Sequence, residues 1–334
     1  MKWTNGKSTI LISLIVLVVL IMVVFQADFS AGHQPEWGVT FSRSYALDLQ
    51  LDWRATYLAI LDDLDISHIR LAAYWDEIES APNQYVFSDL DWQIEQAQAR
   101  QVDIVLAIGR RLPRWPECHD PDWVKHLPPA DANQAVLALL ERLVKRYQAN
   151  PAITAWQIEN EPLFAWFGFC PPPDKDFLTT EIALVKSLDN SRPVIITDSG
   201  ELSNWQAVAG LTDILGTTMY RIVWNQKLGF WDYWFIPPVF YRIKAALTQW
   251  LNPNLQQVIV TELQMEPWAL NKRMVDLTEQ EQAKTLDLRR FNQNIRYVKK
   301  TGFSRVYLWG VEYWCWLKEQ GRPEIWQAAQ QLWR

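Results

Sequence analysis

The chain has 334 residues, of which 49% are apolar and 21% are charged, and its formal net charge is −6. These values are typical of a globular protein with a sizeable core, and they exclude a disordered chain. The negative charge argues against a nucleic-acid partner, which requires a basic face. The chain also contains 20 tryptophans, which suit either core packing or contacts with the apolar faces of sugar rings.

The N-terminus carries the clearest change in composition. Lys2 and Lys7 precede an apolar run from Thr9 to Phe25, whose other polar member is Ser13. A run of this length is just long enough to cross a bilayer, and the lysines keep the N-terminus in the cytoplasm. The pattern predicts an uncleaved signal anchor that places the rest of the chain on the extracytoplasmic side of the membrane.

This interpretation divides the chain into four parts. They are a cytoplasmic segment over residues 1–8, a transmembrane helix over 9–25, a linker over 26–36 and a catalytic domain over 37–334. Two alternatives remain open. One is cleavage near Ala31, where the small-residue pattern is poor, and the other is a buried core helix.

Beyond the linker, short apolar segments alternate with helical ones. Eight such alternations predict an α/β fold of the (β/α)₈ TIM-barrel type, with strands buried on both faces. A doubly wound open sheet is the alternative, but the first strand is not followed by the glycine-rich loop typical of that fold. The expected strands are Trp37–Phe41, His68–Ala73, Val102–Ile108, Ile153–Asn160, Val194–Thr197, Ile214–Met219, Val258–Thr261 and Val306–Trp309.

Helix signals lie between these strands. An apolar stripe with Leu90 marks one helix, and a second stripe, capped at Asp131, ends at Tyr147. A capping box at Thr278–Glu281 opens a third helix that ends before Gly302. A last helix is expected from Glu324 to Trp333.

The carboxyl ends of the expected strands carry polar and aromatic side chains. Because these ends meet at one face of a parallel barrel, the side chains are expected to form one site. Two of them are glutamates, which indicates acid/base and nucleophile roles on one substrate. The residues are Arg70, Asn160, Glu161, Tyr220, Glu262 and Trp309.

This set resembles clan A of the glycoside hydrolases, the retaining (β/α)₈ enzymes that include the cellulase-like family 5 group. In that clan a fourth-strand Asn-Glu-Pro carries the acid/base, and a seventh-strand Glu is the nucleophile. The matches are Asn160-Glu161-Pro162 and Thr261-Glu262, together with Arg70 and, five residues later, Trp75. The resemblance extends from about Trp37 to the end of the chain.

The resemblance implies cleavage of a β-glycosidic bond by double displacement. Glu161 would protonate the leaving oxygen, and Glu262 would attack the anomeric carbon. Repulsion between the two carboxyl groups would raise one pKa and keep Glu161 protonated. Glu159 and Glu266 are the nearby competitors for the two roles.

The other site residues would bind the substrate or hold the nucleophile. The resemblance implies that Arg70 and Tyr220 hold Glu262 ionised, that Asn160 binds the sugar 2-hydroxyl and that Trp309 forms the floor of the subsite. The full substrate-binding set that we predict is Arg70, Asn160, Tyr220, Trp309, Trp75, Arg110 and Trp268.

Two positions depart from the cellulase-like pattern. Gly109-Arg110-Arg111 follows the third strand where that group often has a histidine, and Thr218 stands where a histidine is usual. Arg110 or Arg111 would then supply a polar contact. These departures leave the family within the clan and the sugar open.

A long aromatic segment runs from Trp224 to Tyr241. It suits a lid over the site, a patch at the bilayer interface or a packed cap on the barrel. Of the three cysteines, Cys118 and Cys170 are expected to form a disulfide, with Cys315 free. No Cys or His pair has metal-ligand spacing, so we expect neither a metal nor a cofactor.

The sequence as a whole predicts a monomeric, membrane-anchored retaining β-glycoside hydrolase that acts on a poly- or oligosaccharide. A catalytically inactive glycan-binding barrel and a transglycosylase with the same site are the alternatives. A lyase or a metal-dependent hydrolase would need a Schiff-base lysine or a ligand cluster at the strand ends, and the sequence offers neither.

Overall fold

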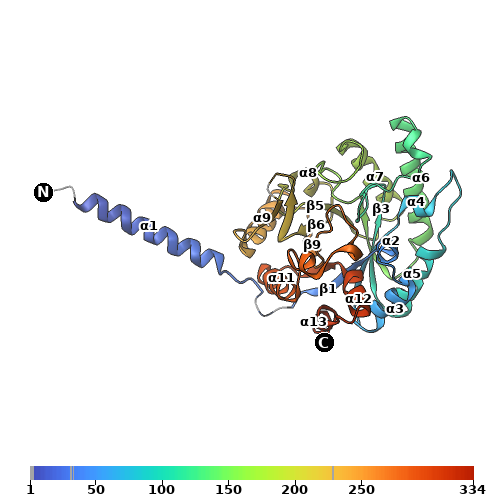
Figure 1. Cartoon of the computed structure of the whole chain (residues 1–334). Helices are drawn as coiled ribbons and strands as arrows, with labels where there is room; N and C mark the ends of the chain where they lie inside the picture. The colour runs from blue at the N-terminus through green and yellow to red at the C-terminus, as the bar shows by residue number, and fades with distance from the viewer. Residues whose placement is uncertain (1–3, 31, 33, 228) are drawn as a thin grey trace.

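The structure is a computed structural model that describes residues 4–30, 32, 34–227 and 229–334. Its described part contains a closed barrel of eight parallel strands, as predicted, in the order β1-β2-β3-β4-β5-β6-β9-β10 with β10 paired to β1 (Figure 1). The strands are β1 (Glu36–Phe41), β2 (His68–Ala72), β3 (Asp103–Ile108), β4 (Ile153–Ile158), β5 (Val194–Asp198), β6 (Ile214–Met219), β9 (Gln257–Gln264) and β10 (Arg305–Trp309).

Helices surround the barrel, and a small antiparallel hairpin of β7 (Ile222–Asn225) and β8 (Gly229–Asp232) follows β6. The longer helices are α3 (Trp53–Asp62), α5 (Ser88–Ala99), α6 (Pro129–Tyr147), α7 (Lys175–Leu188), α9 (Pro238–Leu251), α11 (Leu288–Thr301) and α12 (Val311–Glu319). The shorter ones are α2 (Arg43–Asp48), α4 (Trp75–Ile78), α8 (Gln206–Ala209), α10 (Glu279–Ala283) and α13 (Glu324–Gln330), with 3₁₀ turns at Val124–His126 and Met274–Asp276.

Two helix ends differ from the prediction. The cap expected at Asp131 is wrong, because α6 begins at Pro129. Asp131 lies in the first turn of the helix, where a carboxylate interacts favourably with the helix dipole. The capping box of α10 is confirmed, but the single helix expected up to Gly302 is broken. Asp287 accepts a hydrogen bond from the backbone N–H of Arg290 and so begins a separate helix, α11.

The inside of the barrel is filled by side chains. Val105, Ala155, Ile195, Ile259 and Tyr307 form a buried layer there. Gly38 makes room for it, because a Cβ at this position would lie 2.7 Å from the Tyr307 ring. The barrel is therefore closed through its middle, and polar side chains gather at the carboxyl ends of the strands.

Helix α1 (Thr4–Phe25) leads away from the barrel (Figure 1). Its segment Ser8–Phe25 has a mean hydropathy of 3.1, is not buried by the rest of the protein and is long enough to cross a membrane. Lys2 and Ala31, on which the predicted orientation and the alternative cleavage site depend, lie outside the described residues. The anchor and the boundaries of the four parts stay predictions.

Candidate active site

Glu262 lies near the end of β9 and is 5% exposed. Arg70 of β2 donates a hydrogen bond from Nη1 to Glu262 Oε1 at 2.9 Å, and the Tyr220 hydroxyl donates to Glu262 Oε2 at 3.0 Å. Both carboxylate oxygens therefore accept a hydrogen bond, one of them charge-assisted.

Arg70 connects three strands at the centre of the site, and its side chain is fully buried. Besides Glu262, it donates from Nε to Gln157 Oε1 and from Nη2 to Asn160 Oδ1, both at 2.7 Å. A planar guanidinium with three such partners has one orientation open to it. Arg70 thus fixes Asn160 after β4 relative to Glu262 on β9.

Glu161 follows β4 in a left-handed turn. The predicted strand ends two residues early, at Ile158, because Glu159 and Glu161 have φ of 57° and 45°. The backbone N–H of Glu161 donates to Thr197 Oγ1 at 2.7 Å, and Thr218 Oγ1 donates to Glu161 Oε1 at 3.3 Å. A left-handed backbone conformation is uncommon for a residue other than glycine. Here it is held by side chains of β5 and β6.

The register of the sheet brings Glu161 and Glu262 together. Thr218, which contacts Glu161, is paired with Glu262 between β6 and β9. Burial raises the pKa of Glu161 well above its usual value, and the charge of Glu262 raises it further. Glu161 therefore has a raised pKa beside Glu262, which a guanidinium and a phenol hold in place.

Glu117 is a third carboxyl group of the site, which the sequence interpretation missed. Its Oε2 accepts a hydrogen bond from Asn160 Nδ2 at 3.3 Å. Burial, followed by the charge of Glu262, raises the pKa of Glu117 to about 7. Glu117 in turn helps to raise the pKa of Glu161. The site thus has three interacting carboxyl groups where two were expected.

The predicted aromatic residues differ in their positions. The ring of Trp268 lies 5.6 Å from that of Tyr220, beside the nucleophile candidate. Trp309 is 7% exposed, and the guanidinium of Arg114 lies 4.1 Å from its ring centre. Trp75 is fully buried and donates to Glu79 Oε2, so the structure does not place it where a substrate could reach it.

Both competing glutamates have other partners. Glu266 pairs with Arg114, which also pairs with Glu312 at 3.0 Å. Glu159 is buried and accepts hydrogen bonds from the backbone N–H groups of Arg110 at 2.8 Å and Arg111 at 2.6 Å. These contacts fit structural roles for Glu159 and Glu266.

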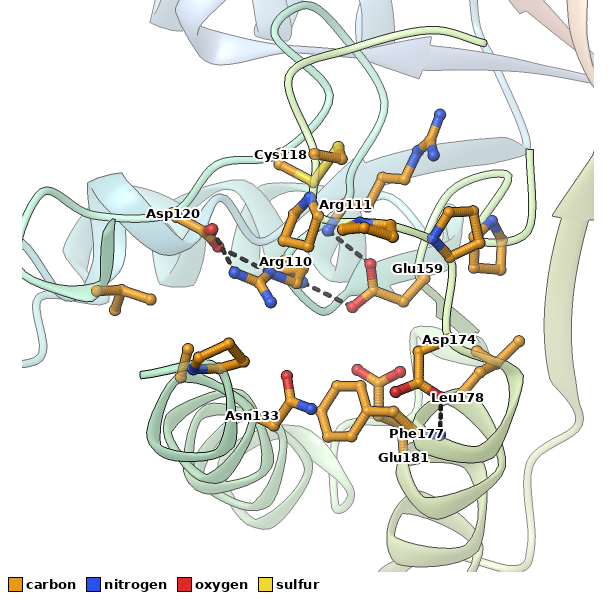
Figure 2. Close-up of a pocket in the computed structure, with 18 of the residues that line it drawn as sticks. Arg110, Arg111, Cys118, Asp120, Asn133, Glu159, Asp174, Phe177, Leu178 and Glu181 are labelled. Carbon is orange, nitrogen blue, oxygen red and sulfur yellow. Dashed lines mark hydrogen bonds and ion pairs between the residues drawn. A yellow bond between two sulfur atoms is a disulfide. The ribbon is translucent and has the colours of Figure 1, made fainter. Parts of the chain in front are cut away.

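Arg110 lies apart from the carboxyl cluster. It pairs with Asp120 and lines a cavity of about 720 Å³ between the loops after β3 and β4 and the helices α6 and α7, which carry Asn133 and Phe177 (Figure 2). Neither Glu161 nor Glu262 lines this cavity. Substrate binding by Arg110 stays a prediction.

The predicted disulfide between Cys118 and Cys170 is present, with Cys315 free and buried. It joins the loop that carries Glu117 to the loop after β4. Over the part of the chain that the structure describes, no group of three or more His, Cys, Asp or Glu side chains is arranged to hold a metal ion.

No protein-family model matches this sequence, and no curated protein matches it. The structure, in contrast, is similar to those of several glycoside hydrolases. An endo-β-1,4-xylanase of family GH10 from Gloeophyllum trabeum aligns with a TM-score of 0.56 at 18% identity, over 85% of this chain and 86% of that chain.

Two further structures show the same likeness. A GH5_18 protein from Bifidobacterium longum subsp. longum aligns with a TM-score of 0.60 at 12% identity, over 83% of this chain and 69% of that chain. The intracellular xylanase of Thermoanaerobacterium saccharolyticum aligns with a TM-score of 0.54 at 16% identity, over 86% and 88%. Because the sequence identities are this low, these similarities show a shared fold. The chain has the (β/α)₈ barrel fold of clan A glycoside hydrolases.

Proposed function

We propose that this protein is a retaining β-glycosidase with Glu161 as the acid/base and Glu262 as the nucleophile. One observation carries the proposal. The two glutamates meet at the carboxyl ends of β4 and β9 in opposite environments, since Glu262 accepts from Arg70 and Tyr220 while the pKa of Glu161 is raised. Double displacement needs this combination of an ionised and a protonated carboxyl group.

In the first step Glu262 attacks the anomeric carbon, and the bond to the leaving oxygen breaks while Glu161 transfers its proton to that oxygen. Glu161 then removes a proton from water, which attacks the glycosyl ester and releases Glu262. Asn160 would face the sugar 2-hydroxyl with the second N–H of its amide Nδ2, because the first donates to Glu117 and its Oδ1 already accepts from Arg70 and Thr197.

Exposed aromatic side chains support a chain-like glycan as the substrate. Trp115, Trp166 and Phe169 lie on the loops after β3 and β4, and Trp166 is 79% exposed. The loops are joined by the disulfide and by the ring contact of Trp115 with Phe169, whose centres are 4.9 Å apart. Flat apolar rings held in this way suit sugar faces. The fold likeness to xylanases agrees with this substrate class.

The test uses activated 2-deoxy-2-fluoro β-glycosides, which accumulate the covalent intermediate. We expect mass spectrometry of the full chain to place the label on Glu262, and a panel of aryl β-glycosides and polysaccharides to identify the sugar. Labelling of another residue, together with wild-type turnover in Glu262→Gln, would contradict the assignment. An inactive glycan-binding barrel would bind glycans without any label or turnover.

A further inference from the structure

Helix α9 has a second apolar face that the barrel does not cover. Its inner face, with Val239, Tyr241 and Ala245, is buried. Its outer face carries large apolar side chains at a spacing of three or four residues, which places them in one stripe along the helix. This α9 stripe consists of Phe240, Ile243, Leu247, Trp250 and Leu251, and its members are between 37% and 75% exposed.

The hairpin before α9 and the residues after it also carry exposed aromatic side chains. Trp224, Phe230 and Trp231 of β7 and β8 and Trp234 and Phe235 after them are also exposed. Exposed apolar patches of this extent mark protein or membrane contacts. Tryptophan in particular prefers the interface between headgroups and acyl chains.

The chain itself indicates which surface covers the stripe. Helix α1, the candidate membrane span, contacts α9, and Figure 1 shows α9 and α11 on the side of the barrel from which α1 departs. The backbone N–H of Phe29 donates to the carbonyl of Lys300 at 2.9 Å, which attaches the linker to the end of α11. Only three residues lie between Phe25 and Phe29, so the Cα of Phe25, at the end of α1, lies within about 14 Å of the Cα of Phe29.

Helix α11 provides matching charge next to the stripe. It packs against α9 and has no acidic residue between Leu288 and Thr301, although the whole chain has a net charge of −6. Basic side chains beside a membrane-facing apolar surface attract anionic lipid headgroups. The basic residues of α11 are Arg289, Arg290, Arg296, Lys299 and Lys300, of which Arg290 is paired with Asp232 of β8 at 3.0 Å.

We propose that the α9 stripe lies in the interface of the bilayer that α1 crosses, and that the basic residues of α11 contact its phospholipid headgroups. The barrel then rests on the membrane along its side and is not suspended on a loose tether. This inference depends on α1 as a membrane span and is independent of the proposed glycosidase activity.

The test measures depth in the bilayer with a nitroxide on single introduced cysteines in the full chain. One chain is placed in each nanodisc of phosphatidylcholine and phosphatidylglycerol. Ile243→Cys and Leu247→Cys report on the stripe, Arg242→Cys on another face of the same helix, and Leu14→Cys on α1. Cys315 is buried, and the other two cysteines form a disulfide, so the introduced thiol is the accessible one.

Oxygen dissolves in the bilayer, and a nickel chelate does not. We expect the ratio of oxygen to nickel collision rates to be several-fold higher at residues 243 and 247 than at 242, and highest at 14. Equal ratios at 242, 243 and 247 would overturn the proposal, and so would a water-exposed label at 14. If the stripe binds a second copy of the chain instead, these single-chain discs leave 243 and 247 in water. A ratio that does not fall when phosphatidylglycerol is omitted would overturn the role of α11.

Discussion

Arg70 offers the sharpest test of how the site is held together. Arg70→Met removes a guanidinium that is fully buried and keeps much of the side-chain volume. The substitution deletes the hydrogen bonds to Glu262 at 2.9 Å and to Asn160 and Gln157 at 2.7 Å. Glu262 then loses its charged partner but keeps the Tyr220 hydroxyl, Gln157 Oε1 loses its guanidinium partner, and Asn160 Oδ1 keeps the Thr197 hydroxyl.

The expected loss of stability follows from these contacts. Breaking a buried ion pair from one side costs about 3–5 kcal/mol, because the other charge is left uncompensated. The two additional bonds to amide oxygens bring the total to roughly 4–6 kcal/mol after the neighbours relax. Arg100→Met is the matched control, since Arg100 pairs with Asp62 at the surface through two hydrogen bonds of 2.5 and 2.9 Å. Exposed pairs of this kind contribute only about 0.2–1 kcal/mol.

The assay is guanidinium unfolding of the full chain in detergent, followed by near-ultraviolet circular dichroism, with turnover measured on the same samples. We expect Arg70→Met to lose stability and activity and Arg100→Met to keep both. Arg70→Lys is expected to fall between them, because a point charge cannot serve three partners in one plane. If Arg70→Met and Arg100→Met differed by less than about 1 kcal/mol, the uncompensated-charge argument would be refuted.

Three further predictions concern Glu117 and Gly109. Because ionised Glu117 raises the pKa of Glu161, Glu117→Gln should move the alkaline limb of the kcat/KM profile down by about one pH unit, and an unmoved limb would show that the two carboxyl groups do not interact. The folded pKa of Glu117, about 7, lies above its ordinary value of 4.5, so its contribution to stability is complete below pH 4.5 and is lost as the pH rises through 7. Glu117→Gln should therefore be more stable than wild type by about 1–3 kcal/mol above pH 7, with no gain at pH 4, as unfolding curves at both pH values would reveal. Gly109 has φ of +127°, and a Cβ there would collide with the Glu159 carboxylate. Gly109→Ala should therefore lower the melting temperature and kcat far more than the control Gly321→Ala, where φ is +78° but no atom lies within 4 Å of the added Cβ. Equal effects of the two substitutions would assign the loss to backbone strain alone.

Much of the barrel could be predicted because its strands are buried on both faces. Each strand is then a short apolar run with clear ends, such as Val194–Asp198, and the alternation of eight such runs with helices specifies the topology. The same logic selected Glu161 and Glu262, since polar residues at the carboxyl ends of buried strands gather at one face. The site residue Gln157 had a weaker sequence signal, since it is a polar side chain inside the apolar run of β4. In the structure it accepts a hydrogen bond from Arg70.

Helix ends were harder to predict because local signals compete there. The apolar stripe that crosses Asp287 reads as one helix, yet the Asp287 carboxylate accepts the backbone N–H of Arg290 and stops it. Trp75 was predicted to bind substrate because of a sequence pattern, but its packing in the fold buries it. Its place five residues after Arg70 matched the clan pattern, but packing buried the indole against Trp123, with ring centres 5.8 Å apart.

Glu117 could not be located from the sequence, because contacts between distant loops place it. It has φ of 73°, and the Cα of Gly168 lies so close that a side chain there would strike the Glu117 Cβ. The backbone N–H of Phe169 donates to the Pro116 carbonyl at 3.1 Å, and Cys118 is bonded to Cys170. A left-handed backbone at a glutamate persists only where its surroundings enforce it. These contacts hold the third carboxyl group against Asn160. The electrostatics of this site are therefore set by the fold of two loops as much as by the Asn-Glu-Pro motif.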